Sequence, residues 1–142
     1  MPRVDFYLLA DAAPGTRLRT ACRLAEKAYQ QGHRVYMYVP AAADATELDD
    51  LLWTFGAGSF VPHEVARSGP AGSAPVLLGT EEPASALNDV LINLRPEVPA
   101  CHARFARVIE IVSGTEDDKA RARERFRAYR EQGSEPHTHQ LE

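Results

Sequence analysis

The side chains best suited to chemistry form no recognisable catalytic set in this sequence. His137 and His139 have the His-x-His spacing of a metal-ligand pair, but they lie in a polar segment, and two ligands on a flexible segment seldom make a closed site. Asp49 and Asp50 are adjacent on a predicted helix, where neighbouring side chains point apart. His63 lies in a predicted loop, where a hydrogen-bonded structural role is more common than a general base. We therefore predict no catalytic residue and no metal site.

The segment after the first predicted strand lacks the features of a nucleotide-binding loop. Residues 10–17 read Ala-Asp-Ala-Ala-Pro-Gly-Thr-Arg, with one glycine, a proline that removes an amide donor, and no lysine at the required place. Phosphate loops need several backbone amides that converge on the ligand. The sequence also has neither the Gly-x-Ser-x-Gly turn of hydrolases nor a His-Glu-x-x-His pair. We therefore predict no nucleotide and no other cofactor.

A positively charged helix is the strongest candidate for a binding surface. Thr115 precedes three acidic residues, a pattern typical of a helix N-terminus, so we predict a helix over residues 116–132. At about 100° per residue, four of its basic side chains share an arc of roughly 80°. They are Lys119, Arg123, Arg127 and Arg130. Phe126 fills the adjoining arc with Ala122 and Tyr129.

This helix admits more than one interpretation. Its basic arc is either a solvated outer face above a strip that packs on the core, or a docking site for an acidic peptide with a hydrophobic anchor. Phosphate binding is a third interpretation, which the acidic remainder of the chain weakens.

A second candidate surface combines aromatic and apolar residues around position 60. Trp53 lies at the edge of the apolar stripe of a predicted helix, and Phe60 follows two glycines in a Ser-Phe-Val-Pro-His segment. Large aromatic residues at such places often anchor protein interfaces, although ordinary core packing gives the same pattern. The predicted partner contacts on this surface are Trp53, Phe60, Val61 and Pro62.

The elements that position these residues alternate between strand and helix. Apolar runs predict strands over residues 4–9, 34–39, 75–78, 90–94 and 107–112, with a possible short extended piece in 59–66. Helices are expected over residues 16–31, 46–55 with Thr46 as its cap, and 116–132. This order predicts an α/β fold: one mostly parallel sheet covered on both faces, which is a three-layer α/β/α sandwich. We expect one domain over residues 1–133 and a flexible polar tail over 134–142.

Composition agrees with a single ordinary globular domain. The 142 residues are 44% hydrophobic and 25% charged, with a formal charge of −4, which argues against a surface devoted to nucleic acid. Cys22 and Cys101 lie far apart and are expected to be buried, reduced thiols. The apolar runs are strand-sized and the N-terminus lacks the apolar stretch of a signal peptide, so we expect a cytoplasmic protein without a membrane segment.

Six segments in a fixed order resemble the chi subunit family of bacterial DNA polymerase III. They are Phe-Tyr-Leu-Leu at 6–9, Leu-x-x-x-Leu-Trp at 48–53, Ser-Phe-Val-Pro-His at 59–63, Gly-x-x-Pro-Val at 72–76, Asp-Val-Leu-Ile-Asn-Leu-Arg at 89–95, and Lys-x-x-Ala-Arg-Glu-Arg-Phe-Arg-Ala-Tyr-Arg at 119–130. The resemblance covers residues 4–133. It implies a Rossmann-like domain without nucleotide binding, and a non-catalytic accessory subunit of the clamp-loader assembly.

The resemblance also implies partners for both candidate surfaces. Lys119, Arg123 and Arg127 would meet the carboxylates of the acidic C-terminal tail of single-stranded DNA-binding protein, and Phe126 would help form an apolar wall. The family pattern favours Tyr at position 126 and Lys at 127, a departure that bears on affinity. The Trp53 surface would bind the psi subunit, or a repair helicase. The free protein would be a monomer, or a heterodimer with psi.

Two other function classes remain open from the sequence. One is direct nucleic-acid binding through the arginine-rich helix, which would give tight, strongly salt-dependent DNA affinity without a protein partner. The other is a small α/β hydrolase or nucleotidyl enzyme, which would need a concave pocket with convergent polar groups at the strand ends.

Overall fold

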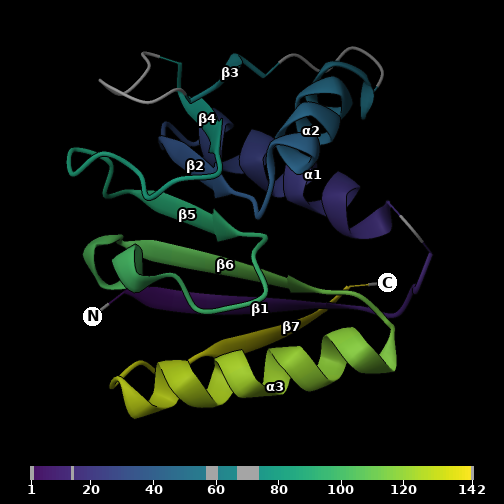
Figure 1. The fold of residues 1–142 in the computed structure, drawn as a ribbon, viewed down its shortest axis with the longest axis vertical. Coiled ribbons are helices and arrows are strands. Elements are labelled where there is room, and N and C mark those ends of the chain that lie inside the picture. The colour runs from purple at the N-terminus through teal and green to yellow at the C-terminus, as the bar shows by residue number, and fades with distance from the viewer. Residues whose placement is uncertain (1, 14, 57–60, 67–73, 142) are drawn as a thin grey trace.

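A seven-stranded, entirely parallel sheet forms the centre of the described part of the molecule (Figure 1). This computed structural model describes residues 2–13, 15–56, 61–66 and 74–141. The strands are β1 (Arg3–Leu9), β2 (Val35–Tyr38), β3 (His63–Val65), β4 (Val76–Gly79), β5 (Val90–Asn93), β6 (Arg107–Val112) and β7 (His137–Leu141). Their order across the sheet is β3-β4-β2-β5-β6-β1-β7, so β3 and β7 are its two edges.

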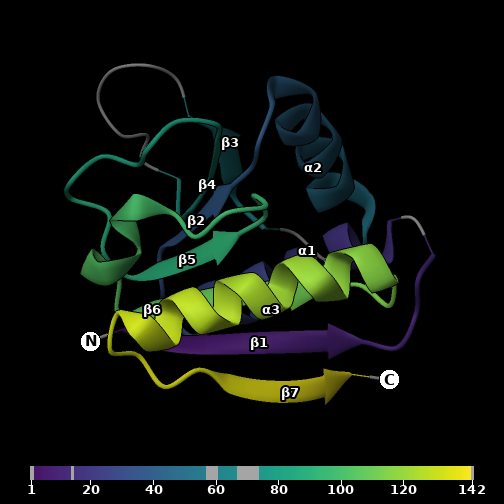
Figure 2. The same cartoon turned by 60° about the horizontal axis from the view of Figure 1, so that its bottom comes forward.

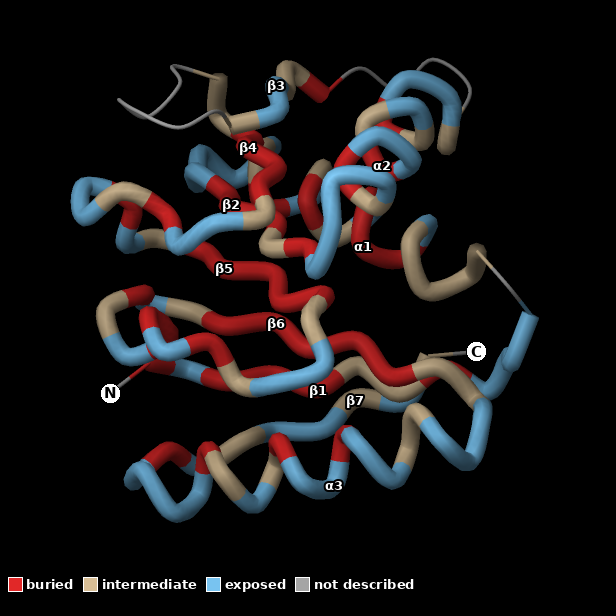
Figure 3. The backbone as a smooth tube through the Cα atoms, viewed as in Figure 1, coloured by how far each residue is buried: buried red, intermediate tan, exposed pale blue. Residues whose placement is uncertain are grey.

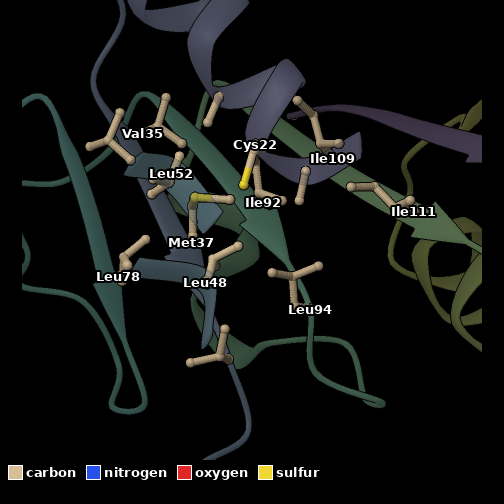
Figure 4. Packing of buried hydrophobic residues seen from close by; sticks show 14 of the residues in the cluster. Cys22, Val35, Met37, Leu48, Leu52, Leu78, Ile92, Leu94, Ile109 and Ile111 are labelled. Carbon is tan, nitrogen blue, oxygen red and sulfur yellow. The ribbon is translucent and has the colours of Figure 1, made fainter. Parts of the chain in front are cut away.

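Helices cover both faces of the sheet. They are α1 (Thr16–Gln30), α2 (Ala42–Thr54), α3 (Glu116–Glu131) and a 3₁₀ turn, η1 (Ala100–Arg104). The first two pack on one face, where Cys22 and Leu48 lie against Met37 and Ile92 of the central strands (Figure 4). Helix α3 packs on the other face, above β1 and beside β7 (Figure 2). The three-layer α/β arrangement predicted from the sequence is therefore confirmed.

Burial follows this layering. The strands β5 and β6 are buried along nearly their whole length, whereas β7 and the outer side of α3 are largely exposed (Figure 3). Continuous apolar runs such as Val-Leu-Ile in β5 are what a parallel strand needs when helices cover both of its faces. Within the described residues, no helix combines the length and the apolar character needed to cross a bilayer.

Helix α2 begins one turn earlier than the sequence indicated. Ala41 is its N-cap and provides no side-chain hydrogen bond. Thr46, the predicted cap, lies inside the helix, where its hydroxyl donates to the Ala42 carbonyl at 3.2 Å. The alanine-rich start favours helix strongly enough to extend it back to Ala42, two residues after Pro40. The prediction of a Thr46 cap is wrong.

The C-terminal segment also differs from expectation. Residues 134–142 were predicted to be a flexible polar tail, but His137–Leu141 form β7, which pairs in parallel with β1. The strand is anchored by His139, whose Nε2 lies 2.8 Å from a carboxylate oxygen of the buried Asp5. The His139 ring also stacks on Tyr7, with 4.8 Å between centroids. Specific contacts to β1 thus order a segment that lacks apolar alternation.

Candidate functional site

A cavity of about 850 Å³ lies between α3 and the part of the sheet made by β1 and β7, and we call it the α3–β7 groove. All four residues of the predicted tail-binding set line it. These are Lys119, Arg123, Phe126 and Arg127. Arg130, from the same basic arc, lines it as well. The structure therefore brings together the side chains that helical spacing had placed on one face.

The floor of the groove is apolar and aromatic. Alternate residues of β1 point to opposite faces of the sheet, which directs Phe6 and Leu8 toward α3. The half-buried ring of Phe126 lies 5.3 Å from the Phe6 ring, measured between centroids, at an interplanar angle of 53°. A tilted aromatic pair of this kind leaves ring surface for a further apolar group to pack against.

The rim of the groove is positively charged and only partly neutralised. Arg127 lies 3.4 Å from Glu124 and Lys119 lies 3.6 Å from Glu116, in exposed pairs of the kind that contribute little energy. Arg123 and Arg130 make no ion pair within the described residues. One acidic residue, Glu131, is among the described residues that line the cavity. The rim can therefore accept an anionic ligand.

A buried polar network fixes the rotation of α3. Arg125 donates through Nε to Glu110 of β6 at 2.9 Å, and the Tyr129 hydroxyl donates to the same carboxylate at 2.6 Å. Asn93 of β5 donates to it at 2.8 Å. Because residues two positions apart point to nearly opposite sides of a helix, an inward Arg125 turns its neighbours in the basic arc outward. The orientation of the basic arc thus depends on an ion pair that lies between α3 and β6.

The start of α3 was predicted correctly. Thr115 is the N-cap, and its Oγ1 accepts a hydrogen bond from the Asp118 amide at 3.2 Å. The Asp118 carboxylate accepts from the Ser113 amide at 2.7 Å. Acidic residues in the first turn also suit the positive end of the helix dipole. These local contacts determine where Lys119 lies along the groove.

The second candidate surface is only partly exposed. Trp53 is 57% exposed at the end of α2, and its ring meets that of His63 edge-on, 4.9 Å between centroids. Pro62 is half-buried. Val61 is 1% exposed and packs in the core with α2, so it supports this surface and does not present a side chain to a partner. Phe60 lies outside the described residues.

Sequence reasoning missed one wall of the groove. Thr138 and Gln140 line it from β7, a strand that was not predicted. The two-residue spacing of Thr138 and Gln140 is typical of one face of a strand. The segment is polar on both faces, however, so it shows no apolar alternation that would predict a strand. Among the described residues, no group of three or more His, Cys, Asp or Glu side chains is arranged to hold a metal ion.

Comparison with known proteins gives consistent matches over nearly the whole chain. The family model described as "DNA polymerase III chi subunit, HolC" matches residues 1–137. The chain is 45% identical to DNA polymerase III subunit chi of Pseudomonas aeruginosa over 141 residues, which is 99% of this chain and 98% of that protein. It is 34% identical to the Escherichia coli subunit chi over 138 residues, 94% of each chain. Subunit chi of Haemophilus influenzae is 31% identical over 132 residues, 91% of this chain and 90% of that protein.

Proposed function

The chain belongs to the family of DNA polymerase III chi subunits, and from that membership we propose that it is a protein-binding adaptor without an active site of its own. In this proposal the α3–β7 groove holds the acidic C-terminal tail of single-stranded DNA-binding protein. The Trp53 surface holds a psi subunit, which connects the chain to the clamp loader. The protein then tethers the polymerase to coated single-stranded DNA.

The observation that carries the proposal is an aromatic floor beside an incompletely neutralised basic rim. Carboxylates on a peptide can pair with Arg123, Arg130 and Lys119 at the rim. A terminal phenylalanine can pack against Phe6 and Phe126 on the floor. A free phosphate would use the rim and leave the aromatic floor unoccupied, so the arrangement favours an acidic peptide with an apolar anchor.

The expected affinity for a single tail is modest. Ordering a flexible peptide offsets much of the contact energy, so we expect a dissociation constant on the order of micromolar. Many tails on one coated strand raise the effective concentration of the second binding event, which makes such weak contacts sufficient for tethering.

The test is the affinity of a synthetic peptide of several aspartates ending in phenylalanine, measured by calorimetry. Arg123→Ala should weaken binding by about 1.5–3 kcal/mol, the loss expected for a charge-assisted pair. Arg121→Ala is the matched control, because Arg121 is exposed on the same helix, pairs with Asp117 and does not line the groove. Raising the salt concentration should weaken wild-type binding.

Equal peptide affinities for wild type and Arg123→Ala would show that the groove is not the tail-binding site. Tight, strongly salt-dependent binding of an oligonucleotide by the isolated protein would instead favour direct nucleic-acid recognition by the same cations.

The psi assignment has a separate test. Trp53→Ala should abolish co-purification with a co-expressed psi subunit while circular dichroism shows an unchanged fold, because exposed tryptophans often dominate interface energy. Thr54→Ala, the next exposed residue of α2, is the control. A complex that survives the Trp53 change would refute the assignment and direct attention to another partner, such as a repair helicase.

A further inference from the structure

We propose that β7 is the second wall of the peptide site: Thr138 and Gln140 contact the main chain of an extended acidic peptide, and His139 holds the strand in position from the opposite face. This inference rests on the proposed function, because it concerns the same groove. The inference adds Thr138 and Gln140, whose contacts to a peptide main chain would let the groove distinguish a peptide from an isolated anion.

The register of the sheet determines which way β7 presents its side chains. Thr138 pairs with Phe6 and Gln140 pairs with Leu8, and all four residues line the groove. Neighbours in register on parallel strands share a face of the sheet. The polar side chains of β7 therefore lie on the same face of the sheet as the apolar floor formed by β1, and they bound the groove across from α3.

Both polar side chains are available for a ligand. Thr138 and Gln140 are exposed, and neither makes a side-chain hydrogen bond to the described part of the chain. Their Cα positions are two residues apart on one strand, a separation of roughly 7 Å. In an extended peptide, the main-chain amide groups that point to one side also recur every two residues. The Thr138 hydroxyl and the Gln140 side-chain amide are therefore spaced to contact two such groups in turn.

The opposite face of β7 carries the contacts that attach it. His139 Nε2 lies 2.8 Å from the Asp5 carboxylate, and the imidazole stacks on Tyr7 of β1. Asp5 is completely buried and also accepts from Arg3 and Arg107. Because β7 is an edge strand with β1 on one side only, these contacts bear directly on its position.

The first experiment tests the ligand contacts in the full-length protein with the aspartate–phenylalanine peptide. The double variant Thr138→Val, Gln140→Met keeps side-chain size but removes the polar groups. Loss of two hydrogen bonds should weaken binding by about tenfold. His137→Thr, an exposed change on the other face of β7, should leave the affinity within about twofold.

The second experiment tests the positioning role. His139→Leu removes the donor to Asp5, whereas His139→Gln keeps one. We expect His139→Leu to speed amide hydrogen exchange in residues 138–140 and to weaken peptide binding several-fold, and His139→Gln to restore much of both. An equal loss of protection in the β5 and β6 amides would make His139 a general stabiliser and would overturn its positioning role.

The outcomes separate this inference from the proposed function. If Arg123→Ala weakens peptide binding and the Thr138→Val, Gln140→Met variant binds as wild type, the groove is the tail site and β7 is not its second wall. If Arg123→Ala has no effect, the groove is not the tail site, and both proposals fail together.

Discussion

Two buried carboxylates in this sheet have opposite electrostatic environments. Burial acts to raise the pKa of the Asp5 carboxyl, but hydrogen bonds from His139, Arg3 and Arg107 outweigh it and hold that pKa below its ordinary value. Glu110 is completely buried, and desolvation raises its pKa despite Arg125 and the hydrogen bonds from its neighbours. The difference follows from the number of cationic donors around each group.

The depressed pKa of Asp5 predicts a stability change at acid pH. The ionised carboxylate stabilises the folded state above the unfolded-state pKa of about 3.9, and this contribution is lost as the pH falls through the lower folded-state pKa. Asp5→Asn should therefore lower the free energy of unfolding at pH 7, and the gap from wild type should close below about pH 4. Urea unfolding measured across this range checks it; a gap independent of pH would contradict it.

The ion pair between Arg125 and Glu110 beneath α3 predicts that changes at the two residues have strongly non-additive effects on the free energy of unfolding. Arg125→Met leaves Glu110 buried without its cation, which should lower the free energy of unfolding by about 3–5 kcal/mol at pH 7. The penalty should shrink at lower pH, where the carboxyl takes up a proton. Replacing both residues by methionine should cost less than the single change, because no uncompensated charge remains. A double-mutant cycle in urea measures this coupling.

Thr115 of α3 and Thr46 of α2 are expected to contribute differently to the free energy of unfolding. Thr115 caps α3 with a hydrogen bond to the Asp118 amide, so Thr115→Ala should lower the free energy of unfolding by about 1 kcal/mol. Thr46 is exposed inside α2 and bonds back to its own helix, so Thr46→Ala should be neutral or slightly stabilising. Equal losses for both variants, measured by urea unfolding, would argue against a specific cap at Thr115.

The elements that the sequence predicted well are those whose local signals agree with their surroundings. Residues 107–112 form β6 over the whole predicted range, because a β-branched apolar segment, interrupted only by Glu110, suits a strand covered on both faces. The last helix also agrees to within one residue, since its cap, acidic first turn and apolar strip indicate the same start. The basic rim of the groove followed directly from helical periodicity.

The elements that the sequence missed depend on distant contacts. β7 reads His-Thr-His-Gln-Leu, which has no apolar alternation, and its order comes from Asp5 and Tyr7 more than one hundred positions away. Burial of Val61 under α2 is likewise a tertiary effect that a loop motif does not encode. Helical spacing therefore found one wall of the groove and could not find the other.

The molecule carries its two candidate surfaces at opposite edges of one sheet. The α3–β7 groove lies at the β7 edge, and Trp53 of α2 contacts His63 of β3 at the other edge. Figure 1 shows α3 beside β7 at one end of the sheet and α2 near β3 at the other. At roughly 4.8 Å per strand, the edges are on the order of 30 Å apart. This distance would let the two partners of the proposed function bind at once without contact.

This separation predicts independent binding. The affinity for the aspartate–phenylalanine peptide should agree within about twofold with and without a psi subunit bound, since distant sites with no shared partners are nearly additive. Calorimetric titration of the complex and of the free protein checks this. A tenfold difference would reveal a coupling of about 1.4 kcal/mol and would require a conformational link through the sheet.

The pairing of Phe6 with Thr138 joins the first and last strands of the described chain, so the floor and the β7 wall of the groove come from opposite ends of that chain. If the groove binds the tail as proposed, a partly folded copy that lacks either strand would not bind one. A peptide at one hundred times its dissociation constant would add about 2.7 kcal/mol to the free energy of any opening, local or global, that separates these two strands. Occupancy of the groove would therefore report that the first and last strands are paired.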